Sequence, residues 1–346
     1  MKILITGASG QLGQDLQKEC RRRGIDYVAT DLQRNDAGHG ESNTQSSGFA
    51  SNQEPGTGNL EQSLESSGNQ EPGTCNRSHC DPNCEPPATG HVLHLDITDF
   101  RTVPKILTET KPDVIINCAA YNAVDKAEED WKAAFMVNSL GPRNLAIISE
   151  ELKIPLVHFS TDAVFDGKKG TPYTIWDQPN PLSKYGHSKL LGERLITQVC
   201  SRSFIVRLSW VFGKGNVNFV RKVIQWSAGT RELKGAYDQT SCPSYTVDLA
   251  KAIIDLLNTG AYGLYHITNT GFASKFELAE ETLRLIGWPG KILPVKSSEF
   301  ESAAQRPEFS AMDSFPLKET IGYELPHWKD ALSRFLQESG VINSQK

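Results

Sequence analysis

Two side chains four residues apart, Tyr185 and Lys189, are of the types needed for proton transfer to a carbonyl oxygen. On a helix this spacing puts both on one face, so the ammonium group would lie beside the phenol. A phenol titrates near pH 10, and a neighbouring cation favours the phenolate, so we expect Lys189 to lower the pKa of Tyr185. In the reduction direction Tyr185 would then protonate a keto oxygen, to which the hydroxyl of Thr161 donates a hydrogen bond.

Glycines at intervals of three, Gly7, Gly10 and Gly13, follow the first apolar run of the chain. Gly7 would permit a tight turn, Gly10 would let backbone amides and a helix N-terminus approach a pyrophosphate, and Gly13 would let that helix pack closely on a sheet. A Tyr and a Lys at this spacing occur often by chance. Here they follow a dinucleotide-binding motif and the Ser160-Thr161 strand end in the order that a reductase requires.

Asp31 ends the second predicted strand, 18 residues after Gly13. An acidic side chain at this place commonly accepts hydrogen bonds from the adenosine ribose, which favours NADH. Arg34 is close enough to accommodate a 2′-phosphate, so both NADPH and NADH stay open. Tyr185 and Lys189 are expected to contact the nicotinamide ribose of either cofactor.

Alternating apolar strands and amphipathic helices extend along most of the chain and predict an α/β fold with a Rossmann-like, doubly wound parallel sheet. We assign residues 1–205 to an NAD(P)-binding domain and residues 206–346 mainly to a smaller C-terminal substrate-binding α/β lobe. The chain is expected to re-enter the first domain near residues 246–268. Strands are predicted at residues 2–6, 27–30, 92–95, 114–117, 156–160 and 204–208, and a packing helix at 325–336.

The formal net charge of −5 and the pI near 5.9 argue against a general nucleic-acid or anionic-membrane surface. An anionic ligand would therefore need a local basic pocket. The start of the chain has no signal-peptide pattern, and no apolar stretch reaches the roughly 18 residues of a membrane span. We therefore expect a cytoplasmic protein, with its seven cysteines as reduced thiols.

The segment from about residue 35 to residue 90 is rich in Ser, Gly, Asn, Gln, Glu and Pro, and we predict a disordered insertion there. It contains an internal repeat, in which residues 52–57 return as residues 69–74. Its Cys75, His79, Cys80 and Cys84 do not have the spacing of a standard zinc site, so no metal ligands are assigned.

Outside residues 35–90 the chain resembles the dTDP-4-dehydrorhamnose reductases of the extended short-chain dehydrogenase/reductase superfamily. The motifs that carry this resemblance are residues 2–7 with 10–13, 95–99, 117–128, 160–162, 164–167, 181–186, 207–210, 238–239, Arg306-Pro307 and Ser310. The resemblance implies reduction of the 4-keto group of dTDP-4-dehydro-β-L-rhamnose to dTDP-L-rhamnose, the last step of dTDP-rhamnose synthesis for surface polysaccharide. It also implies a homodimer, and Mg²⁺ in some relatives.

The same resemblance implies site residues. Further cofactor contacts are expected at Gln11, Leu12, Asp96, Ile97, Ala119, Ala120 and Tyr121. Substrate contacts are expected at Val124, Thr161, Asp162 and Trp210.

The chain departs from the family pattern at Ala163, Cys242 and Met312, none of which is a proposed proton-transfer group. Two alternatives stay open. One is another nucleotide-sugar enzyme of the same fold, either a reductase or an epimerase or dehydratase. An epimerase or dehydratase would retain its NAD through the catalytic cycle. The other is a non-catalytic regulatory subunit that resembles the beta subunit of methionine adenosyltransferase.

Overall fold

The computed structural model describes residues 1–32, 92–215 and 218–342. The predicted disordered insertion at 35–90, with its cysteines and histidine, lies outside the described residues, and so does Arg34. The described cysteines, Cys20, Cys118, Cys200 and Cys242, are all free thiols.

A parallel sheet of seven strands forms the centre of the described chain, in the order β11-β6-β5-β4-β1-β2-β3. Its strands are β1 (Lys2–Thr6), β2 (Asp26–Asp31), β3 (Leu93–His94), β4 (Val114–Asn117), β5 (Leu156–Thr161), β6 (Ser203–Leu208) and β11 (Gly263–His266). The central strands β4, β5 and β6 are buried along their whole length, as expected for strands covered on both faces. The predicted doubly wound α/β class is confirmed, and the predicted strands lie within one residue of the observed ones.

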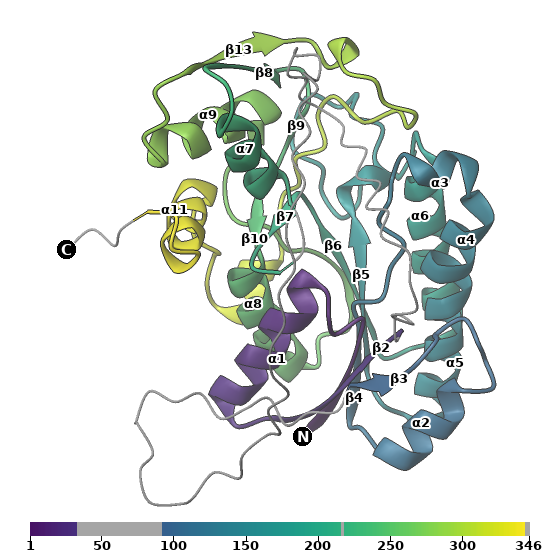
Figure 1. Ribbon diagram of the computed structural model, residues 1–346. Coiled ribbons are helices and arrows are strands. Elements are labelled where there is room, and N and C mark those ends of the chain that lie inside the picture. The colour runs from purple at the N-terminus through teal and green to yellow at the C-terminus, as the bar shows by residue number, and fades with distance from the viewer. Residues whose placement is uncertain (33–91, 216–217, 343–346) are drawn as a thin grey trace, which may run out of the picture.

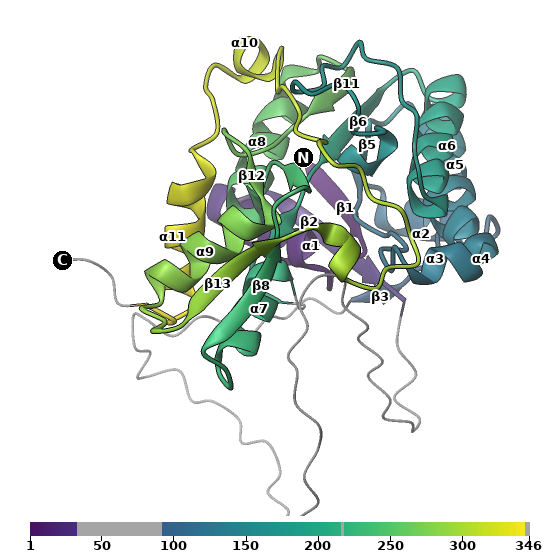
Figure 2. The same ribbon diagram turned by 90° about the horizontal axis from the view of Figure 1, so that it is seen from above.

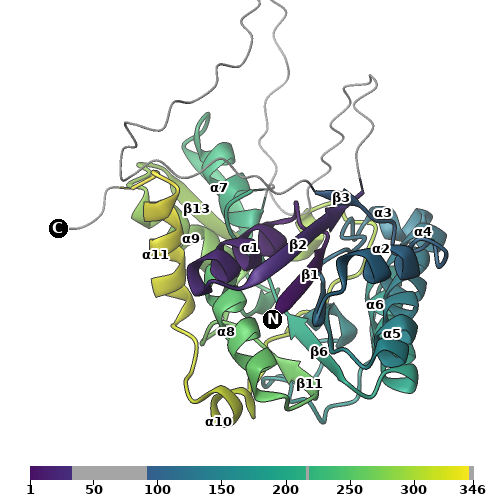
Figure 3. The ribbon, with the colours of Figure 1, turned by 90° about the horizontal axis from the view of Figure 1, so that it is seen from below.

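Helices cover both faces of this sheet (Figures 1 and 3). On one face lie α1 (Gln11–Arg23) and α8 (Thr246–Thr259), whose apolar side chains share a core with β1 and β6. On the other face α2 (Val103–Thr110), α5 (Gly141–Leu152) and α6 (Lys184–Val199) enclose a second core. Between β4 and α5 the chain forms the short helices α3 (Lys126–Glu129) and α4 (Trp131–Phe135), followed by a π-helical turn over Met136–Leu140.

Beyond β6 most of the chain gathers at the carboxyl ends of the central strands, on one side of the molecule (Figure 2). This part contains α7 (Phe219–Ser227), α9 (Lys275–Leu285) and the parallel pair β8 (Glu232–Ala236) and β13 (Lys291–Val295), which share a small core. Short strand pairs add β7 (Val211–Phe212) with β10 (Ser244–Tyr245) and β9 (Thr240–Ser241) with β12 (Ala273–Ser274). The chain returns to the large sheet through α8 and β11, which pairs with β6. The assignment of separate domains stays a prediction.

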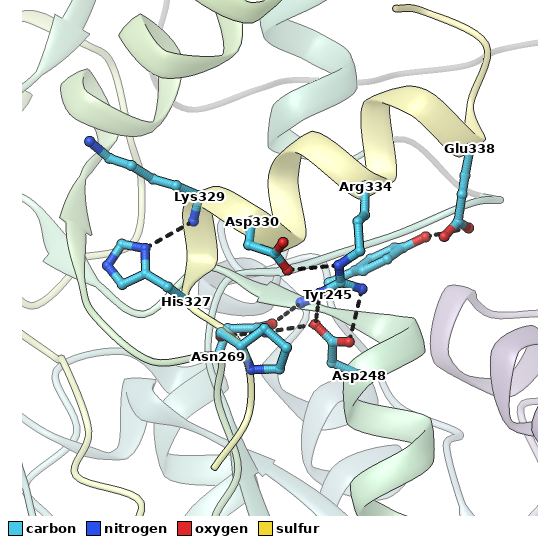
Figure 4. Close-up of polar contacts among 9 residues, drawn as sticks. Tyr245, Asp248, Asn269, His327, Lys329, Asp330, Arg334 and Glu338 are labelled. Atoms are coloured by element: carbon cyan, nitrogen blue, oxygen red, sulfur yellow. Dashed lines mark hydrogen bonds and ion pairs between the residues drawn. The ribbon is translucent and has the colours of Figure 1, made fainter. Parts of the chain in front are cut away.

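The C-terminal helix α11 (Trp328–Glu338) packs through the apolar face predicted for it, with Trp328, Leu332 and Phe335 buried. Polar contacts attach it to α8 (Figure 4). Arg334 donates hydrogen bonds to both carboxylate oxygens of Asp248, at 3.0 and 2.6 Å. A short helix, α10 (Leu317–Ile321), precedes it. Among the described residues, no helix has the length and apolar character needed to span a membrane.

Candidate active site

The glycine-rich loop after β1 has the shape of a phosphate cradle. Gly7 has φ of 59°, in the left-handed region, and a β-carbon there would lie 2.6 Å from the backbone nitrogen of Ala119. A β-carbon on Gly13 would lie 2.7 Å from the carbonyl oxygen of Gly7. Gly10 caps α1, and no described side chain accepts a hydrogen bond from the first-turn amides. The loop and helix N-terminus therefore fit the pyrophosphate of a dinucleotide.

Asp31 lies at the end of β2 and holds this loop in place. Its carboxylate accepts hydrogen bonds from the backbone amides of Ser9 and Leu32, each at 2.8 Å. The side chain is half-buried. Asp31 thus has a structural contact in addition to the ribose contact expected from the sequence, which stays a prediction.

Asp96 and Ile97 follow β3 and have different surroundings. The Asp96 carboxylate accepts hydrogen bonds from the amide and the hydroxyl of Thr98, both at 2.8 Å. The side chain of Ile97 is buried in the core under α5, and its carbonyl oxygen accepts a hydrogen bond from Asn144 at 3.0 Å. Only backbone atoms of Ile97 are therefore placed to contact a ligand.

The loop Ala119–Tyr121 after β4 lies against the glycine-rich loop and is fixed by hydrogen bonds to Asn138. The Asn138 side chain accepts a hydrogen bond from the amide of Tyr121 at 2.9 Å and donates one to its carbonyl oxygen at 3.0 Å. It also donates to Ser188 of α6 at 3.0 Å. Asn138 lies in the π-helical turn, a form often found near functional sites, and it was not predicted.

The expected proton-transfer residues lie on the first turns of α6, which begins after the N-cap residue Ser183. The Tyr185 phenol is buried and hydrogen-bonds the side chain of Thr161 at the end of β5. Burial raises the pKa of Tyr185 to about 12; the hydrogen bond to Thr161 opposes this shift and the charge of Asp162 adds to it.

Lys189 lies one turn further along the helix and points to the sheet. Its Nζ donates a hydrogen bond to the carbonyl oxygen of Phe159 at 2.5 Å, and burial lowers its pKa to about 8. The expectation that Lys189 lowers the pKa of Tyr185 is wrong for the folded chain by itself. The ammonium group is directed to a backbone carbonyl, and the burial of the phenol dominates its pKa.

Asp162 is fixed in the site by hydrogen bonds from four hydroxyl groups. Its Oδ2 accepts hydrogen bonds from three serine hydroxyls, those of Ser209 at 3.1 Å, Ser241 at 2.8 Å and Ser310 at 2.6 Å. Its Oδ1 accepts one from Thr161 at 3.1 Å. These serines come from three distant segments, and Asp162 therefore joins the end of β5 to the C-terminal part of the chain. Ser209 and Ser310 lie in motifs noted above, whereas Ser241 was not predicted.

The predicted substrate residues line one cavity of about 320 Å³. Trp210 is held there with φ of 38°, a conformation that costs energy for a bulky residue and is concentrated at functional sites. Val124 also lines the cavity and packs in a cluster with Tyr185. The residues lining the cavity are Val124, Thr161, Asp162, Ala163, Tyr185, Trp210, Phe219, Ala236, Gln239, Lys275, Ser297, Phe300, Ser302, Arg306, Pro307 and Ser310.

Arg306 also lines this cavity. Its guanidinium group contacts both carboxylate oxygens of Asp125, at 3.1 and 2.6 Å. This ion pair connects the C-terminal segment to the loop before α3. Lys275 also lines the cavity and was not predicted from the sequence. Its position directly after the N-cap residue of a helix is unfavourable for a cation, and this could have indicated a functional role.

Comparisons with known proteins show similarity to one family along most of the chain. A family model described as the RmlD substrate binding domain matches residues 56–341. A dTDP-4-dehydrorhamnose reductase of Streptomyces griseus is 38% identical over 247 residues, which cover 69% of this chain and 81% of that protein. The crystal structure of a dTDP-4-dehydrorhamnose reductase from Clostridium acetobutylicum is similar with a TM-score of 0.78 and 32% identity, covering 98% of this chain and 100% of that one. A Bacillus anthracis dTDP-4-dehydrorhamnose reductase in complex with NADP has a TM-score of 0.78 and 31% identity, covering 97% of this chain and 99% of that one.

Proposed function

This chain belongs to the RmlD-like reductase family, and we propose that it reduces the 4-keto group of dTDP-4-dehydro-β-L-rhamnose to give dTDP-L-rhamnose, using NADPH or NADH. The observation that supports this most strongly is the shared cavity of Tyr185, Thr161, Asp162 and Trp210. A proton donor, a hydroxyl partner, a carboxylate and a large aromatic wall face one space, as reduction of a sugar ketone requires.

In this proposal Tyr185 is the general acid. Its pKa of about 12 keeps the phenol protonated at neutral pH, so the proton is available when negative charge develops on the keto oxygen. Thr161, whose hydroxyl contacts the phenol and donates to Asp162 Oδ1, would turn its single proton to the same oxygen and orient it. Lys189 would hold the nicotinamide ribose. The bound reduced nicotinamide would supply the hydride.

Asp162 is assigned to binding of the sugar hydroxyls, because its carboxylate is fixed by four hydroxyl groups and lies beside Thr161. Trp210 would cover an apolar face of the deoxysugar. The cofactor would lie along the cradle of Gly7, Gly10 and Gly13, with its adenosine ribose near Asp31.

We assign no role to a metal ion. Among residues 1–32, 92–215 and 218–342, no group of three or more His, Cys, Asp or Glu side chains is arranged to hold one. The cytoplasmic location and the homodimer, both expected from the sequence, stay predictions.

The test is to mix the purified chain with dTDP-4-dehydro-L-rhamnose, generated in situ from dTDP-glucose, and NADPH or NADH. We expect oxidation of the cofactor, followed by its absorbance, and formation of dTDP-L-rhamnose, identified by chromatography and mass spectrometry. No oxidation with either cofactor, in protein shown to be folded, would contradict the proposal. Tightly retained NAD in that protein would then favour the epimerase alternative.

A further inference from the structure

Lys275 is the first residue of α9, directly after the N-cap residue Ser274. A cation is unfavourable at this end of a helix, because the free backbone amides already carry positive partial charge. The nearby acid on the same helix, Glu277, does not pair with Lys275. Its carboxylate instead accepts hydrogen bonds from the amide and hydroxyl of Ser274, at 2.7 and 2.9 Å, in a capping box.

The ammonium group of Lys275 lies against two aromatic rings of the cavity. Its Nζ is 3.6 Å from the centroid of the Trp210 ring and 4.3 Å from that of Phe219. Its backbone is fixed by a hydrogen bond from the Lys275 amide to the carbonyl oxygen of Gln239, at 3.0 Å. Among the described residues, none accepts a hydrogen bond from Nζ. An ammonium group has three donors, and a cavity that leaves them unused is suited to an anionic ligand.

Other charges around Lys275 make this part of the cavity positive. Burial is the main cause that lowers its pKa to about 7, and the positive charges of Arg306 and Lys222 lower it further, while Asp162 opposes them. Arg306 is paired with Asp125, so among the charges that act on Lys275 the carboxylate of Asp162 alone opposes the positive ones. The whole chain carries a net charge of −5, and this local excess of positive charge is the basic pocket that an anionic ligand needs.

We propose that Lys275 binds the diphosphate of the nucleotide-sugar substrate, an inference that rests on the proposed function. The diphosphate is the anionic part of a dTDP-sugar, and charged hydrogen bonds to phosphate oxygens are stronger than neutral ones. Lys275 lines the same cavity as the sugar-binding residues Thr161 and Asp162. It is thus a specificity-determining residue for a substrate that carries a diphosphate.

The experiment measures binding of dTDP and of thymidine, which lacks the diphosphate, by isothermal titration calorimetry. We expect Lys275→Gln to weaken dTDP binding about tenfold or more and to leave thymidine binding unchanged. Lys275→Arg, which retains the positive charge, should bind dTDP within about threefold of the wild-type protein. The matched control is Lys291→Gln, which removes an exposed lysine of β13 that pairs with Glu232 outside the cavity.

Equal dTDP affinity of the wild-type protein and Lys275→Gln would overturn the inference. So would an equal loss of thymidine and dTDP affinity, because Lys275 would then only support Trp210. Binding does not require turnover. If Lys275→Gln weakens dTDP binding but the wild-type protein does not reduce the sugar, the proposed reaction alone is contradicted. If the wild-type protein reduces the sugar and Lys275→Gln binds dTDP equally well, the inference alone is contradicted. A wild-type protein that does not bind dTDP would contradict both.

The pH dependence of binding provides a second readout. The ammonium form of Lys275 binds the anion, so dTDP affinity of the wild-type protein should fall as the pH rises through about 7. The terminal phosphate of dTDP gains charge near pH 6 and would by itself change affinity in the opposite direction. Lys275→Arg should not show the fall. Asp162, Arg306 and Lys222 are present in both proteins, so the difference between the two profiles isolates Lys275.

Discussion

Ser310 donates a hydrogen bond to Oδ2 of Asp162 at 2.6 Å, across 148 positions of the sequence. Asp162 is buried, and a buried carboxylate is stable only when its oxygens are hydrogen-bonded or paired with a cation. The contact therefore fixes the C-terminal segment against the end of β5. Four residues earlier in the same segment, Arg306 forms an ion pair with Asp125.

Removing the Ser310 hydroxyl should both destabilise the protein and displace groups that line the cavity. Ser310→Ala should lower the free energy of unfolding by about 1.5–3 kcal/mol, because the acceptor is charged, and reduce kcat/KM by up to about 100-fold. Urea unfolding and steady-state kinetics measure the two effects. Ser339→Ala is the control, since the buried Ser339 hydroxyl has no hydrogen-bond partner among the described residues. Equal stabilities of the two variants would contradict the role of the contact.

Tyr185→Phe removes the proposed acid but keeps the buried ring. We expect kcat to fall about 10²- to 10⁴-fold while the dissociation constant of NADPH stays within about twofold of the wild-type value. Stopped assays and quenching of protein fluorescence by NADPH measure these quantities. Tyr262→Phe, at an exposed tyrosine before β11, should leave both unchanged. Turnover near the wild-type rate in Tyr185→Phe would exclude the phenol as the acid.

The raised pKa of Tyr185 gives the two directions of the reaction different pH profiles. Below its pKa of about 12 the phenol is protonated, so kcat for reduction should not depend on this group between pH 6 and 9. Oxidation of dTDP-L-rhamnose needs the phenolate, so its kcat should rise about tenfold per pH unit over that range. Saturating substrate removes effects on binding from both profiles. A kcat for oxidation that is flat from pH 6 to 9 would show that the phenol is not the base.

Gly13→Ala should weaken cofactor binding, because the added methyl group meets backbone atoms. The β-carbon would lie 2.7 Å from the Gly7 carbonyl oxygen and 2.8 Å from the Ala8 α-carbon, and neither atom can move without displacing the loop. We expect a loss of about 1–3 kcal/mol in stability and a higher dissociation constant for NADPH. Gly229→Ala, where the methyl group meets nothing within 4 Å, should change stability by less than about 0.5 kcal/mol. An unchanged dissociation constant in Gly13→Ala would contradict the assigned cradle.

The attachment of α11 to α8 should contribute to stability. Within the described part of the chain, Arg334→Met leaves the carboxylate of Asp248 with Asn269 as its remaining side-chain donor, and we expect a cost of about 1–3 kcal/mol (Figure 4). The matched control is Arg284→Met, which breaks the bidentate pair of Arg284 with Glu281 within α9. That arginine is 64% exposed, so its loss should cost at most about 0.5 kcal/mol. Thermal unfolding compares the two, and equal shifts in Tm would refute the difference.

Features that depend on neighbours along the chain could be predicted from the amino-acid sequence. The glycines of the first loop, the strands β1, β4, β5 and β6, and the helical spacing of Tyr185 and Lys189 were all predicted. Backbone freedom, apolar periodicity and side-chain spacing are local properties, and each is visible in a short stretch of residues.

Contacts between groups that are distant in the sequence became known from the folded structure. Ser241 reaches Asp162, Lys275 reaches the ring of Trp210, and Asn138 holds the loop at Tyr121, although no spacing in the sequence relates the members of each pair. The direction of the Lys189 ammonium group also depends on the tertiary structure, because the packing of α6 on β5 brings the carbonyl oxygen of Phe159 within reach. The burial and the hydrogen bonds of a charged side chain depend on segments that are distant in the sequence. The pKa values of the site therefore depend on the complete fold and not on local sequence.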